Sequence, residues 1–69
     1  MISHIEQGLI FEKEERYKEA ISEYEKAALE EPSNIEPLIS KGALLEEVGD
    51  YENALQSFNE AILLNSQDT

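Results

Sequence analysis

The chain has 69 residues, among them 16 acids and 5 bases, and a formal net charge of −11 at pH 7. Phosphate groups would be repelled, so neither nucleic acid nor an anionic membrane is an expected partner. Without cysteine the chain cannot form disulfides or thiolate metal sites, and a reducing, cytoplasmic location is expected. No apolar run approaches the ~18 residues of a membrane span, and no signal peptide is expected.

Apolar residues recur at helical spacing along the chain, and strand-like alternation is absent, so the fold is expected to be all-α. Ala20, Tyr24 and Ala27, for example, share one stripe at spacings of three and four residues. Four helices are predicted, at residues 2–14, 17–30, 35–47 and 51–64.

The connection between the first two helices has no obvious breaker. Residues 12–16 read Glu-Lys-Glu-Glu-Arg, and all of these are good helix formers. Two alternatives stay open here: a turn, or one fused helix over residues 3–30 that would support a domain-swapped dimer.

The other two connections carry clear signals. A break between the second and third helices is predicted at Pro32-Ser33-Asn34. Asn34 is predicted to cap the third helix, which places Pro37 in its first turn, where a missing N–H costs nothing. Gly49 is expected in the left-handed conformation at the end of that helix, and Asp50 is expected to cap the fourth.

The sequence repeats itself at an interval of 34 residues. Seven pairs are identical: Ile5/Ile39, Gly8/Gly42, Glu12/Glu46, Tyr17/Tyr51, Ala20/Ala54, Ala27/Ala61 and Leu29/Leu63. Because the repeated residues are mostly small or apolar, the repeated feature is expected to be a packing unit. Two tandem helical hairpins are therefore predicted.

This pattern resembles the tetratricopeptide repeat, a helix–turn–helix unit of the same length. The first copy matches the family through Gly8, Phe11, Tyr17, Ala20, Tyr24, Ala27 and Pro32. The second matches through Leu38, Gly42, Leu45, Tyr51, Ala54, Phe58 and Ala61. The resemblance implies one domain over residues 1–69, with repeats at 1–34 and 35–68 that form a short right-handed α-solenoid.

The resemblance also assigns packing roles. Gly8 leaves room where the helices of the first hairpin approach, and Tyr24 fills that room; the second copy repeats the arrangement. Tyr17 and Tyr51 match packing positions too, and all three tyrosines are interpreted as structural. Leu29 and Leu63 are apolar where the family is usually charged, so each is expected to be partly exposed.

Reactive chemistry is not evident in the sequence, and an enzyme, a cofactor and a metal site are not expected. His4 has no second histidine beside it and is interpreted as a partly buried core residue rather than a ligand or an acid–base group. Acidic runs such as Glu12, Glu14 and Glu15 lack the glycine bend and alternating ligands of a calcium loop.

The resemblance places ligand peptides on the concave side of the array, which the first helix of each hairpin lines. The matching positions are Ile2, Ile5, Leu9, Glu12 and Lys13, then Glu36, Ile39, Ala43, Glu46 and Glu47. Such a groove would be apolar in its middle and acidic at its edge. It would suit an amphipathic protein segment with basic flanks, and it lacks the cationic clamp with which some members bind a C-terminal carboxylate.

A second interface is expected at the end of the array, because two repeats leave the fourth helix uncovered. Leu55, Ile62 and Leu63 would face water there and favour a homodimer or higher oligomer. Two alternatives to a peptide-binding module stay open. One is a structural, self-assembling domain, and the other is a fragment of a longer array or of a larger regulatory protein.

Overall fold

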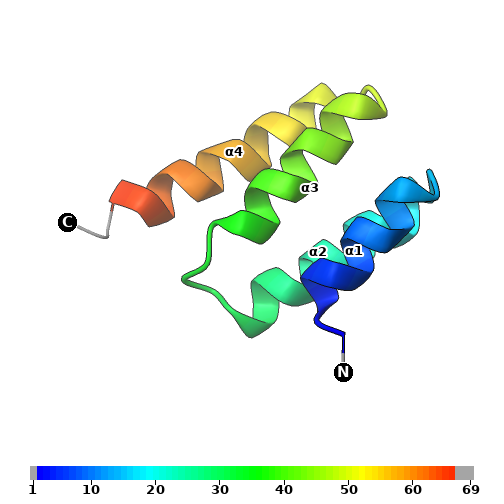
Figure 1. Cartoon of the computed structure of the whole chain (residues 1–69). Coiled ribbons are helices and arrows are strands. Elements are labelled where there is room, and N and C mark those ends of the chain that lie inside the picture. Colours follow the sequence, from blue (N-terminus) through cyan, green and yellow to red (C-terminus); the bar gives the residue numbers. More distant parts are fainter. Residues whose placement is uncertain (1, 67–69) are drawn as a thin grey trace.

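The structure, a computed structural model, describes residues 2–66, and within them the elements are four α-helices without strands. These are α1 (His4–Lys13), α2 (Tyr17–Glu30), α3 (Glu36–Glu47) and α4 (Tyr51–Ser66). Figure 1 shows two antiparallel hairpins, α1 with α2 and α3 with α4, stacked through α2 and α3. The predicted all-α fold of two tandem hairpins is confirmed, and the helix ends differ from the prediction by at most two residues.

The first turn is formed, so the alternative of one fused helix is wrong in this structure. α1 ends before Glu14, Glu15 takes the left-handed conformation with φ 61°, and the Arg16 amide donates to the Phe11 carbonyl at 2.8 Å. The Arg16 guanidinium also lies over the Phe11 ring, 5.1 Å from its centre. Tertiary packing of the hairpin therefore overrides the helix propensity of this segment.

The second turn reaches the same geometry with a glycine. Gly49 has φ 88° and stands 34 residues after Glu15, and the Asp50 amide donates to the Leu45 carbonyl at 2.8 Å. Glycine adopts this conformation at no steric cost, whereas a residue with a Cβ is strained there. The prediction for Gly49 is confirmed. Asp50 directly precedes α4, and its carboxylate accepts a hydrogen bond from Asn53 Nδ2 at 2.8 Å.

The link between the hairpins departs slightly from the prediction. Ile35 rather than Asn34 directly precedes the first helical residue, Glu36. The Asn34 side chain still satisfies a free backbone N–H at the start of the helix, because its Oδ1 accepts a hydrogen bond from the Glu36 amide at 3.0 Å. Pro37 lies in the first turn of α3, as predicted, and its side chain is fully buried.

Each hairpin is closed by one aromatic ring on one glycine. A Cβ at Gly8 would lie 2.5 Å from Tyr24 Cε1, and a Cβ at Gly42 would lie 2.7 Å from Phe58 Cε1. These distances are far below van der Waals contact, so the predicted role of both glycines is confirmed. Tyr24 is fully buried in a cluster with Ala20 and Leu44, which joins α2 to α3.

Candidate protein-binding surfaces

The lone histidine takes part in a polar contact that ties α1 to α2. His4 Nδ1 lies 2.7 Å from Glu23 Oε1, and its Nε2 lies 3.4 Å from Glu30 Oε2. The hydrogen bond from His4, helped by Lys26, holds the pKa of the Glu23 carboxyl below its ordinary value. His4 is half-buried, as predicted, and acts as a structural clasp. Among the described residues no group of acids and histidines is arranged to hold a metal ion.

The residues predicted for the groove lie on α1 and α3 and on the chain just before α1. Ile2, Leu9, Ile39 and Ala43 are all exposed apolar residues, and Leu9 and Ile39 expose 46% and 44% of their surface. The acids Glu36, Glu46 and Glu47 are exposed beside them, as is Lys13. Glu12 is half-buried, because its Oε1 accepts a hydrogen bond from the Tyr24 hydroxyl at 2.8 Å.

A hollow of about 220 Å³ lies between the C-terminal halves of α1 and α3. Its lining consists of Glu12, Tyr17, Ala43, Leu44 and Glu47. Burial and then the neighbouring carboxylates raise the pKa of the Tyr17 hydroxyl above its ordinary value. The structure thus joins three of the predicted residues and adds Tyr17, which sequence reasoning assigned to packing alone.

Two other predicted groove residues lie apart from this hollow. Ile5 is half-buried and packs against the cluster of Ala20, Tyr24 and Leu44. Ile39 lines a separate hollow of about 440 Å³ between α3 and α4, together with Ile35, Phe58, Ala61, Ile62 and Asn65. Packing inside the hairpins and between them decides these placements, and the spacing of residues along the sequence does not contain that information.

The outer face of α4 is open where the outer face of α2 is covered. Tyr51, Leu55 and Ile62 expose 68%, 61% and 61% of their surfaces. Their counterparts 34 residues earlier are half-buried beside α3: Tyr17, Ile21 and Ala28. The expectation that Tyr51 packs is therefore wrong, because no helix within residues 2–66 covers it. We call Tyr51, Leu55 and Ile62 the open face.

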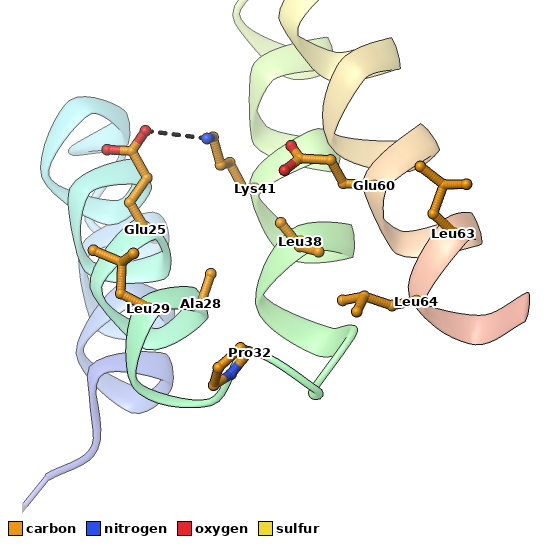
Figure 2. A pocket seen from close by; sticks show the side chains of 9 residues that line it. All are labelled: Glu25, Ala28, Leu29, Pro32, Leu38, Lys41, Glu60, Leu63 and Leu64. Carbon is orange, nitrogen blue, oxygen red and sulfur yellow. Dashed lines mark ion pairs between the residues drawn. The ribbon is translucent and has the colours of Figure 1, made fainter. Parts of the chain in front are cut away.

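Leu63 is also exposed, at 63%, but it lies on another side of α4. It borders a groove of about 620 Å³ between α2 and α4, which we call the α2–α4 groove. Figure 2 shows α3 at its floor, with an apolar lining of Ala28, Leu29, Pro32, Leu38, Leu63 and Leu64. Glu25, Lys41 and Glu60 lie at one end, where Lys41 Nζ pairs with Glu25 Oε2 at 3.1 Å.

Sequence reasoning missed this groove, although a signal was present. Leu29 and Leu63 occupy the same position in the two repeats, and both were expected to be partly exposed. The structure confirms their exposure, at 82% and 63%, and brings them to opposite walls of one groove.

Comparison with known proteins identifies the repeat. The family model described as tetratricopeptide repeat matches residues 3–34 and again residues 35–68. No curated protein and no solved structure matches the chain. Within residues 2–66, no helix combines the length and the apolar character that crossing a membrane would require.

Proposed function

Because the chain belongs to the tetratricopeptide repeat family, whose members generally serve as protein–protein interaction modules, we propose that it binds a partner protein through the α1–α3 face. This face comprises the exposed residues Leu9, Ile39 and Ala43 and the acids Glu12, Glu36, Glu46 and Glu47. The partner would be an amphipathic segment with an apolar stripe and basic flanks.

The observation that carries this proposal is the hollow beside Ala43. Its two carboxylates, Glu12 and Glu47, and the Tyr17 ring surround a small apolar patch on α3. A leucine-sized side chain would cover Ala43, and a neighbouring lysine or arginine would meet the carboxylates. The net charge of −11 would also speed the encounter with a basic segment at low salt.

The test is a titration of ¹⁵N-labelled protein with a synthetic peptide of about twelve residues, which carries leucines at helical spacing and a lysine at each end. The amides around Leu9 and Ala43 should shift, and Leu9→Glu and Ala43→Glu should each weaken binding by about tenfold or more. Leu55→Glu, on the open face, is the matched control and should bind normally. Ile5→Glu is unsuitable as a test because Ile5 packs against the core.

A structural role is the second candidate, and the open face supports it. The counterparts of Leu55 and Ile62 in the first repeat are half-buried beside α3, so the same surface on α4 has the chemistry of a packing face. We propose that two copies associate through it. Leu63 was also predicted to take part in self-association, and it lines the α2–α4 groove as well.

Light scattering over a range of concentration and salt tests this second role. The molar mass should rise above the 7.8 kDa of one chain. The rise should be larger in moderate salt, which screens the repulsion between two acidic copies. Leu55→Glu should abolish association and spare peptide binding. A mass of one chain under all conditions would rule out self-assembly.

A further inference from the structure

We propose that the α2–α4 groove is a second protein-binding site, which accepts a segment with two or three large apolar side chains followed by a lysine or an arginine. The site lies outside the α1–α3 face and is separate from the open face. It would let one small domain hold two segments at once.

The apolar half of the groove is suited to large side chains. Leu29 and Leu63 expose 82% and 63% of their surface, while Leu38 at the floor exposes only 9%. Figure 2 shows these three leucines on the two walls and the floor, with Pro32 closing the lower end. The volume of about 620 Å³ falls in the range of roughly 300–1,000 Å³ that is typical of ligand pockets.

The other end of the groove is acidic. Glu25 is neutralised by Lys41, at 3.1 Å, and these are the groove's only opposite charges among the described residues. Glu60 therefore remains as an excess carboxylate, and within residues 2–66 no cation pairs with it. A lysine or arginine that follows the apolar side chains would supply the missing partner charge.

A small polar hollow continues the groove beyond this charged end. It measures about 200 Å³, and it shares Glu25, Lys41 and Glu60 with the apolar half. Asn53, Gln56 and Ser57 line it further along α4. The lining is therefore apolar at one end, acidic in the middle and polar at the other end. A protein segment can match this sequence of environments, whereas a purely apolar molecule cannot.

Charge also decides between a different protein and a second copy of this chain. Each copy carries a net charge of −11, so a second copy would bring acidic residues toward Glu25 and Glu60. A basic segment gains attraction at the same place. The occupant is therefore a partner of opposite charge.

The test uses ¹⁵N-labelled full chain and two synthetic peptides of about twelve residues. One carries leucines spaced three and four apart and then two lysines; the other carries glutamates in place of the lysines. The lysine peptide should shift the amides of Leu29, Leu38 and Leu63, and it should bind about tenfold more tightly than the glutamate peptide. Glu60→Lys should reverse that preference.

Two variants separate this site from the α1–α3 face. Leu29→Glu should remove the shifts in the α2–α4 groove and leave the fold intact by circular dichroism, because Leu29 is largely exposed. Leu9→Glu should leave those shifts unchanged. Shifts around Leu9 and Ala43 without any at Leu29, Leu38 and Leu63 would overturn the proposal and would still support the function proposed above. Equal binding of both peptides in the groove would also overturn it.

Discussion

The two repeats carry one residue pattern in two different surroundings. In the first repeat, the outer face of α2 packs against α3, and Tyr24 at its centre is fully buried. In the second repeat, nothing within residues 2–66 covers the outer face of α4, and Phe58 at the matching position is only half-buried. Residues that pack in the first repeat thus lie at the surface in the second, where no neighbouring helix within residues 2–66 covers Tyr51 and Leu55.

The two hairpins also differ in the side-chain contacts that hold their helices together. The first hairpin uses polar groups, with His4 on Glu23 and the Tyr24 hydroxyl on Glu12. At the positions that match His4 and Glu23, the second hairpin has Leu38 and Ser57, both buried. One backbone arrangement is therefore closed by two kinds of chemistry, a hydrogen bond between histidine and a carboxylate in the first hairpin and buried Leu38 and Ser57 in the second.

The largest effect is expected from truncating the two central rings. Tyr24→Ala should cost about 3–4 kcal/mol, because it empties a fully buried site. A domain of this size has little more stability than that, so the cooperative transition in urea should be lost. Phe58→Ala should cost only about 1–2 kcal/mol, since Phe58 is only partly buried. Equal losses would contradict the difference between covered and open repeats.

The two glycines sharpen the same comparison. Gly8→Ala forces a methyl group against a ring that cannot move, so we expect a loss of about 1–2 kcal/mol by urea denaturation. Gly42→Ala meets a ring that can shift toward the open side, and the better helix propensity of alanine offsets about 1 kcal/mol of the strain. That variant should be close to neutral. A larger loss of stability from Gly42→Ala than from Gly8→Ala would show that the Phe58 ring is held more tightly than the Tyr24 ring.

The turns offer a stabilising change. Glu15→Gly should raise the free energy of unfolding by about 0.5–1 kcal/mol, because glycine relieves the left-handed conformation that Gly49 already occupies in the second turn. Gly49→Ala is the matched change and should be destabilising. Thermal denaturation of both variants is the measurement, and a less stable Glu15→Gly protein would contradict the observed turn geometry.

The smallest effect is a pH dependence confined to the first repeat. The hydrogen bond from His4 lowers the pKa of Glu23 below its ordinary 4.5, so its contribution to stability is present above that pH and is lost as the pH falls through the folded-state pKa. Glu23→Gln should therefore be less stable at neutral pH and lose less stability on acidification. His4→Leu, which introduces the residue that the second repeat has at this position, should also lose less stability on acidification. Acid profiles parallel to that of the parent chain would refute the clasp.

The sequence predicted the parts of the fold that depend on local pattern. The 34-residue repeat and the left-handed Gly49 follow from residue type and spacing, and the resemblance to the family implied the contact of Gly8 with Tyr24. The first turn could not be predicted with certainty, because Glu15 has no local preference for the left-handed conformation that tertiary contacts impose on it.

The candidate sites were harder to predict, because they depend on how one hairpin is rotated on the other. Packing inside the second hairpin places Ile39, and the helical spacing of α4 sets Leu63 apart from Leu55 and Ile62. The rotation brings Ile5 against the cluster that contains Leu44 of α3. It also creates the α2–α4 groove from residues that the sequence marks only as unusually apolar. The exposure of Leu29 and Leu63 was predicted, whereas the exposure of Tyr51 and the grouping of residues into surfaces were not.

The most direct test of the central claim is to cover the open face. A chain with a second copy of residues 35–68 added in register would place a third hairpin against Tyr51, Leu55 and Ile62. If this face is an unfilled packing surface, the free energy of unfolding in urea should rise by at least about 2 kcal/mol, because adjacent repeats stabilise one another through the interface they bury. An unchanged free energy of unfolding would contradict the account.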